Sequence, residues 1–148
     1  ELKKHIEHHG IAPERVVFAK RTSHAEYRAR MQLADVFLDT TPYNSGSTAR
    51  DVLDCGLPMV TLRGQTMVSR MGASMLDAVG LNELITDSHE AYVALILKIA
   101  GNKIYRNELA ASLVSSVKRK QTNAHLLTAS FERELGRMYQ EKVSHSAG

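Results

Sequence analysis

Short apolar runs alternate with amphipathic stretches along this chain, in the order expected of a parallel sheet covered by helices. Runs at residues 16–19, 34–38 and 59–62 are too short for helices and predict buried strands, and a further short strand is expected within 81–86. Parallel strands need crossover connections, which are usually helices. The pattern therefore predicts an α/β fold with a three-layer, Rossmann-like parallel sheet, formed by residues 1–148 as a single domain.

Helix signals lie between these runs and continue after them. Gly10 ends a first helix over residues 2–9, and Ser23 with Glu26 forms an S-x-x-E capping box that starts another. Extra C-terminal helices are predicted after the sheet, where apolar positions recur every three or four residues, over residues 88–101, 104–118 and 124–142.

Two stripes of apolar residues predict which helix faces are packed against other elements. Met67, Met71 and Met75 recur every four residues in a helix that Gln65 and Thr66 can start, which predicts a stripe facing the core. The last helix carries a second stripe, made of Leu127, Phe131, Leu135 and Met138. This stripe fits a helix packed on the domain, and it would be exposed if its packing partner belongs to another domain.

The turn after the run at 34–38 carries the chemistry of an anion-binding site. Gly46 allows close approach to the backbone, Ser47 and Thr48 can cap the following helix, and the free N–H groups at that helix start favour an anion. Asp51 lies one turn further along, where a carboxylate can accept hydrogen bonds from two ribose hydroxyls. The alternative is that Ser47 only caps the helix and Asp51 only interacts with its dipole.

Three longer runs extend this pattern, namely QLADVFLDT at residues 32–40, VLDCGLPMVT at 52–61 and GQTMVSRMGASML at 64–76. Together they resemble the C-terminal catalytic half of the O-linked N-acetylglucosamine transferase family, which includes the plant SPINDLY proteins and bacterial relatives. The likeness extends over residues 15–100 and weakly to the end of the chain. It implies the C-terminal half of a two-domain GT-B glycosyltransferase, which holds the uridine diphosphate of the sugar donor.

The resemblance implies roles for the residues of the turn. It places Ser47 and Thr48 on the diphosphate and Asp51 on the ribose. Members of the family usually have a histidine immediately before the two hydroxyl residues, where this chain has Gly46. This departure removes an imidazole donor from the predicted phosphate site.

A second predicted contact lies at residues 22–30, where the resembled family binds the uracil base. The family uses a backbone group, a lysine, a histidine and an arginine at the positions of Thr22, His24, Tyr27 and Arg30. Only the arginine is identical, although the ring of Tyr27 can still stack on a pyrimidine. The alternative is that Tyr27 packs at the sheet edge and Arg30 is a solvated surface residue.

The implied function is that of an inverting glycosyltransferase, which transfers N-acetylglucosamine, or a related hexose, from its UDP-sugar to serine or threonine hydroxyls of a protein acceptor. The resemblance places the catalytic residues, the acceptor domain and a tetratricopeptide array upstream of Glu1, so we expect a fragment that is inactive alone. Neither a cofactor nor a metal is expected. Two alternatives stay open: another GT-B transfer, of glucose to asparagine or of fucose from a guanosine donor, and a non-catalytic interaction module.

Composition narrows the partners and the compartment. The net charge of +3 is spread along the chain, and three phenylalanines without tryptophan provide little surface for stacking nucleic-acid bases, so no nucleic-acid partner is expected. A single cysteine, Cys55, predicts no internal disulfide and a reducing, cytoplasmic location. No apolar run reaches the roughly 20 residues of a membrane-spanning helix, so no membrane contact is expected.

Overall fold

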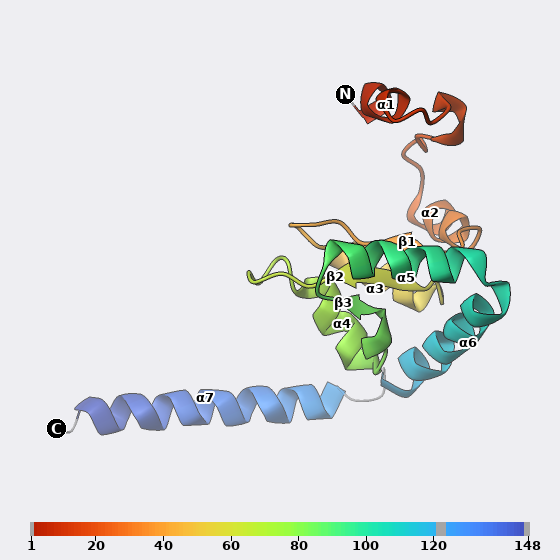
Figure 1. The fold of residues 1–148 in the computed structure, drawn as a ribbon. Helices are drawn as coiled ribbons and strands as arrows, with labels where there is room; N and C mark the ends of the chain where they lie inside the picture. The colour runs from red at the N-terminus through yellow and green to blue at the C-terminus, as the bar shows by residue number, and fades with distance from the viewer. Residues whose placement is uncertain (1, 121–123, 147–148) are drawn as a thin grey trace.

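The computed structural model describes residues 2–120 and 124–146, and its centre is an open sheet of three parallel strands (Figure 1). The strands lie in the order β1, β2, β3 and have the bounds Phe37–Leu38, Met59–Leu62 and Ile85–Thr86. The register is given by four pairs, Phe37 with Met59, Leu38 with Val60, Thr61 with Ile85 and Leu62 with Thr86. Each strand therefore pairs with the next one along the chain.

Helices cover both faces of this sheet. α3 (Ser47–Asp54) joins β1 to β2, α4 (Met71–Val79) joins β2 to β3, and these two helices contact each other and β2. α5 (His89–Gly101) contacts β2 and β3 and lies in front of the strands in Figure 1, with α3 behind them. All residues of β2 are buried because this central strand has helices on either side. The predicted three-layer α/β fold is confirmed.

The apolar core lies where the sheet meets α3, α4, α5 and α6 (Lys103–Lys120). Val52 of α3, Leu76 of α4, Ile99 of α5 and Leu113 of α6 are completely buried. Burial of each such side chain contributes about 1.5–3 kcal/mol. Because α3 and α4 each follow a strand of the parallel sheet, this packing holds their amino ends at the carboxyl edge of the sheet, where such folds bind ligands.

The other elements extend from this core. Before the sheet come α1 (Leu2–His8), the 3-10 helix η1 (Pro13–Arg15) and α2 (His24–Met31), and η2 (Asn82–Leu84) leads into β3. α7 (Ala124–Ser146) projects away from the body of the molecule in Figure 1. In the part of the chain that the structure describes, no helix has both the length and the hydropathy needed to cross a membrane.

The strand predicted at residues 16–19 is absent, and the one predicted at 34–38 is reduced to β1. Val17 and Phe18 are 84% and 54% exposed, and residues 16–19 have no strand geometry. No strand among the described residues pairs with the N–H and C=O groups of this segment. Apolar side chains without such a neighbour do not make a strand, whereas β2, with a strand on either side, has its predicted bounds.

α4 begins later than predicted. Residues 64–70 fold as a loop, in which Ser69 Oγ accepts a hydrogen bond from the Thr66 N–H at 3.0 Å. The Gly64 N–H donates to the Ser69 carbonyl at 2.8 Å. These local hydrogen bonds replace the helical ones that a start at Gln65 or Thr66 would need.

The predicted methionine stripe is interrupted as a result. Met67 lies in the loop and is 80% exposed, Met71 is the first residue of α4, and Met75 packs against the core. The prediction of a core-facing side chain is right for Met75 and wrong for Met67.

The apolar stripe of α7 faces solvent. Phe131, Leu135 and Met138 are all exposed, and the side chain of Leu127 lies outside the described residues. Of the two arrangements predicted for this helix, the structure therefore shows the exposed one.

Candidate functional site

A buried carboxylate organises the loop that follows β1. Asp39 is 2% exposed, and its Oδ1 accepts hydrogen bonds from the N–H groups of Thr40 at 3.0 Å and Ser45 at 2.7 Å. The Thr61 hydroxyl of β2 donates to Oδ2 at 2.7 Å. The Tyr92 hydroxyl of α5 donates to the Asp39 carbonyl at 2.8 Å. Burial and then the nearby Asp39 charge raise the pKa of Tyr92, so its hydroxyl keeps its proton at neutral pH and can donate this bond. These bonds fix where α3 begins.

Asn44 joins this loop to residues 64–70. The residue is completely buried; its N–H donates to the Val68 carbonyl at 3.0 Å and its Nδ2 to the Thr40 carbonyl at 2.7 Å. Its Oδ1 is buried without a hydrogen-bond partner in the described part of the chain. The loops that precede α3 and α4 are therefore held together at one point.

The amino end of α3 is not capped by a side chain. Gly46 is the N-cap, so the predicted capping role of Ser47 and Thr48 is wrong. Ser47 is already the first helical residue, and side-chain capping requires the hydroxyl to come from the residue before it. Ser47 is exposed and Thr48 is half-buried. Uncapped N–H groups and two hydroxyls therefore lie at the positive end of the helix dipole, an arrangement that binds anions.

Asp51 joins α3 to α2 through a hydrogen bond with His24 and an ion pair with Arg28. Its Oδ2 lies 3.1 Å from His24 Nε2, and its Oδ1 lies 3.2 Å from Arg28 Nη1. The sequence predicts roles for His24 and Asp51 but not for Arg28. Arg28 lies four residues after His24 on the same face of α2, and this spacing is the signal that could have identified it.

The predicted capping box at the start of α2 is present. The Glu26 N–H donates to the Ser23 hydroxyl at 3.3 Å, and the Ser23 N–H donates to the Glu26 carboxylate at 3.1 Å. The Thr22 hydroxyl also donates to this carboxylate. Hydrogen bonds from Thr22 first, and then from Ser23, lower the pKa of Glu26 to about 2. The Thr22 side chain is thus engaged at the helix start, which leaves its backbone as the group available to a ligand.

Tyr27 and Arg30 share a face of α2. The Arg30 guanidinium lies 6.0 Å from the centroid of the Tyr27 ring, and its Nη1 donates to the Lys20 carbonyl at 3.1 Å. Tyr27 is half-buried against the core, and its ring lies 6.4 Å from the ring of His24. Packing of Tyr27, one of the two predicted alternatives, is therefore observed, while part of its ring stays accessible.

The structure brings the two predicted groups of site residues together. Thr22, His24, Tyr27 and Arg30 lie at α2, and Gly46, Ser47, Thr48 and Asp51 lie at α3. The contact between His24 and Asp51 joins the two groups directly. Residues distant in sequence therefore meet where α2 packs against α3.

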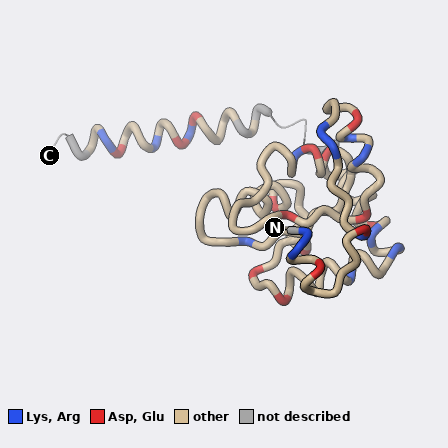
Figure 2. Tube along the Cα trace, turned by 90° about the horizontal axis from the view of Figure 1, so that it is seen from above, with Lys and Arg blue, Asp and Glu red and all other residues tan. Residues whose placement is uncertain are grey.

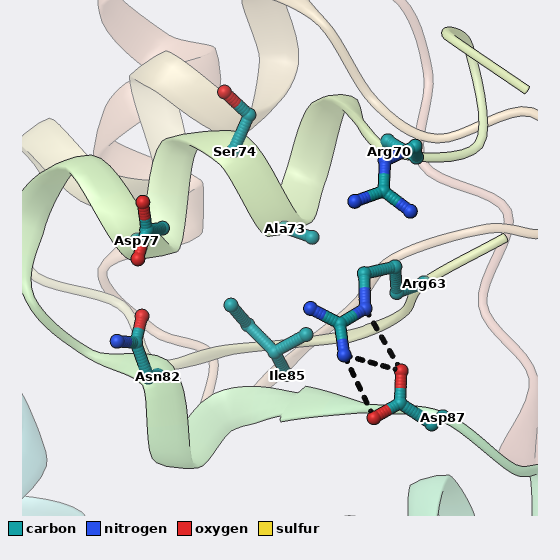
Figure 3. Close-up of a pocket in the computed structure, with 8 residues that line it drawn as sticks. All are labelled: Arg63, Arg70, Ala73, Ser74, Asp77, Asn82, Ile85 and Asp87. Carbon is teal, nitrogen blue, oxygen red and sulfur yellow. Dashed lines mark hydrogen bonds and ion pairs between the residues drawn. The ribbon is translucent and has the colours of Figure 1, made fainter. Parts of the chain in front are cut away.

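A cavity of about 590 Å³ opens beside α4 at the carboxyl ends of β2 and β3 (Figure 3). Arg63 and Asp87, which follow these two strands, form an ion pair with two hydrogen bonds of 2.8 and 2.9 Å. Arg70 donates to the Gly64 carbonyl at 3.2 Å, and Asp77 lines the cavity further along α4. The sequence does not reveal the Arg63–Asp87 pair, since it depends on β2 and β3 being neighbours.

Charges of both signs are interspersed over the molecule (Figure 2). Within the described ranges, no group of three or more histidine, cysteine, aspartate and glutamate side chains is placed to hold a metal ion. The polar groups at α2 and α3 are the N–H groups of the helix starts, hydroxyls, and the contacts of Asp51 with His24 and Arg28.

Known proteins show the same combination of sequence and fold. The family model described as glycosyl transferase family 41 matches residues 1–131. The chain belongs to glycosyl transferase family 41. This family 41 chain is 36% identical over 98 residues to the UDP-N-acetylglucosamine–peptide N-acetylglucosaminyltransferase of Caenorhabditis elegans, in an alignment that covers 66% of the chain and 8% of that protein. The probable transferase SEC of Arabidopsis thaliana is 35% identical over 108 residues, which cover 72% of the chain and 11% of that protein.

A solved structure extends this family relationship to the fold. A mutant of the Thermobaculum terrenum O-GlcNAc transferase superposes with a TM-score of 0.88 at 28% identity. The superposition covers 95% of the family 41 chain and 27% of the Thermobaculum terrenum chain. The resemblance to O-linked N-acetylglucosamine transferases, and the predicted Rossmann-like half of a GT-B enzyme, are confirmed. The chain spans about a tenth of the length of the two curated relatives, 8% and 11%.

Proposed function

We propose that this family 41 chain is the UDP-sugar-binding part of an inverting glycosyltransferase, and that the whole enzyme transfers N-acetylglucosamine to serine or threonine hydroxyls of proteins. The names of the Caenorhabditis elegans and Arabidopsis thaliana relatives support this donor and a peptide acceptor. The observation that carries the proposal is the uncapped amino end of α3, with Asp51 one turn away.

In this proposal the start of α3 binds the diphosphate. The N–H groups of the first turn and the hydroxyls of Ser47 and Thr48 contact the phosphate oxygens, and Gly46 lets the backbone approach them. Negative charge grows on the diphosphate as its bond to the sugar breaks. Donors that the Asp39 hydrogen bonds already hold in place stabilise this charge without reorganising. That no metal or cofactor takes part remains a prediction.

α2 and Asp51 bind the nucleoside in the same proposal. The ring of Tyr27 stacks on the uracil base, and the Thr22 backbone and Arg30 hydrogen-bond to its edge. Asp51 accepts hydrogen bonds from the ribose hydroxyls, beside His24. The support for this arrangement is the contact of His24 with Asp51 and the position of Arg30 next to Tyr27.

Other predictions about the whole enzyme remain predictions. They are catalytic residues upstream of Glu1, an association with tetratricopeptide repeats, a cytoplasmic location, and the absence of nucleic-acid and membrane partners.

Isothermal titration calorimetry with UDP and GDP tests the proposed function. We expect the chain to bind UDP more tightly than GDP. Asp51→Ala should weaken UDP binding by about tenfold or more, since a hydrogen bond to a charged group contributes about 1.5–3 kcal/mol. Asp54→Ala is the matched control, because Asp54 lies on the same helix and pairs with Arg50 at 3.0 Å.

The other two binding results would each favour one of the alternative functions. Tighter binding of GDP would contradict the UDP donor and favour fucose transfer from a guanosine donor. Binding of neither nucleotide would favour a non-catalytic interaction module with this fold. This is the alternative suggested by the departures from the family at Gly46, His24 and Tyr27.

A further inference from the structure

We propose that Arg28 is a positioning residue, which orients the Asp51 carboxylate for the ribose of the nucleotide. This inference rests on the proposed function, because it names a further residue of the same site. It starts from the two contacts of Asp51 that link α3 to α2, with His24 and with Arg28.

The two donors hold opposite oxygens of the Asp51 carboxylate. Arg28 Nη1 lies 3.2 Å from Oδ1, and His24 Nε2 lies 3.1 Å from Oδ2. A single hydrogen bond would let the carboxylate rotate about its Cβ–Cγ bond, whereas two bonds to different oxygens fix its plane. A carboxylate has about four acceptor sites, so two stay available for the vicinal hydroxyls of a ribose.

Of the two donors, Arg28 is the one that is always charged and the less exposed. Its guanidinium is charged at every physiological pH and its side chain is 36% exposed, whereas the His24 side chain is 67% exposed. The carbonyl of Arg28 also accepts a weak hydrogen bond from Cys55 Sγ at 3.8 Å, which ties its backbone to the end of α3. Arg28 therefore approaches Asp51 from a fixed backbone.

The charge of Arg28 also offsets an electrostatic cost of nucleotide binding. Asp51 lies one helical turn from the proposed diphosphate, so a carboxylate without a partner would repel it. A cation on the side of Asp51 that faces α2 balances this charge while leaving the ribose side open. Asp51 can then accept hydroxyl hydrogen bonds without disfavouring the diphosphate.

Calorimetry with UDP and 2′-deoxy-UDP tests the inference. The unmodified chain should bind UDP more tightly than 2′-deoxy-UDP. Arg28→Gln should weaken UDP binding by about tenfold and should lower the ratio of the UDP affinity to the 2′-deoxy-UDP affinity by about fivefold. Arg28→Lys keeps a cation and should recover most of the ratio. Arg50→Gln is the matched control, because it removes an exposed ion pair between Arg50 and Asp54 within α3, the helix that carries Asp51. This variant should change the ratio by less than about twofold.

The affinity ratio separates positioning from a merely structural role. A structural role would weaken both nucleotides equally, so an unchanged ratio in Arg28→Gln would overturn the inference while leaving the proposed function intact. An unmodified chain that binds no UDP would overturn both. Circular dichroism of each variant shows whether the fold is retained. Should Arg28→Gln unfold, Arg28→Met, which also removes the cation, is expected to lower the ratio by a similar factor.

Discussion

Gly72, in the first turn of α4, lies directly against the buried carboxylate of Asp39. A Cβ built on Gly72 would lie 2.2 Å from Asp39 Oδ2 and 2.7 Å from Thr61 Oγ1, well inside normal contact distance. This close approach lets α4 pack on the same carboxylate that holds the loop before α3. The starts of both helices therefore depend on one buried hydrogen-bonded pair, Asp39 and Thr61.

Gly72→Ala is expected to destabilise the fold by about 1–3 kcal/mol, because the added methyl group must displace a buried carboxylate and its hydrogen bonds. Urea unfolding followed by circular dichroism measures this change. Gly101→Ala is the control, since a Cβ at Gly101, in the last turn of α5, meets nothing within 4 Å. Equal stability of the two variants would show that the close approach of Gly72 is not required.

The capping box of α2 makes part of the stability depend on acidic pH. Hydrogen bonds from Thr22 and Ser23 lower the pKa of Glu26 from 4.5 to about 2. A carboxyl group with a lowered pKa in the folded state contributes stability that is present above its unfolded pKa and lost as the pH falls toward the folded value. Between pH 4.5 and about 2 we therefore expect a steeper loss of stability in the unmodified chain than in Glu26→Gln. Urea unfolding across this window tests it, and parallel curves would contradict it.

Restoring the histidine of the resembled family at Gly46 should strengthen nucleotide binding. A Cβ at this position would meet Met71 Cε at 2.9 Å, which is the flexible end of a side chain that can move. We expect Gly46→His to bind UDP about tenfold more tightly, through an added charge-assisted hydrogen bond to phosphate, and Gly46→Ala to show no gain. Calorimetry compares the two variants. If they bind UDP equally, an imidazole at this position does not contact the phosphate.

Features with local causes can be predicted from the sequence. The capping box of Ser23 and Glu26 is present because both partners lie within one helical turn. Gly56 follows the end of α3 with φ of +71°, a conformation that glycine adopts without strain. β2 has its predicted bounds because its apolar run is buried on both faces.

Features that depend on distant partners cannot be predicted in this way. The hydrogen bonds to Asp39 from the Ser45 N–H and from Thr61 hold Gly46 as the N-cap of α3. No local pattern shows these bonds. The pairing of Arg28 with Asp51 likewise requires α2 and α3 to pack side by side. Sequence patterns therefore propose residues for the candidate site, but they do not show the contacts that those residues make.

NMR of the isotope-labelled chain shows whether the uncapped start of α3 binds a diphosphate. The amide resonances of Ser47, Thr48 and Ala49 report on the N–H groups that would contact the phosphate oxygens. We predict that UDP and inorganic pyrophosphate both shift these three resonances, whereas uridine leaves them in place. If UDP shifts other amide resonances and leaves these three unchanged, the diphosphate does not bind at the start of α3.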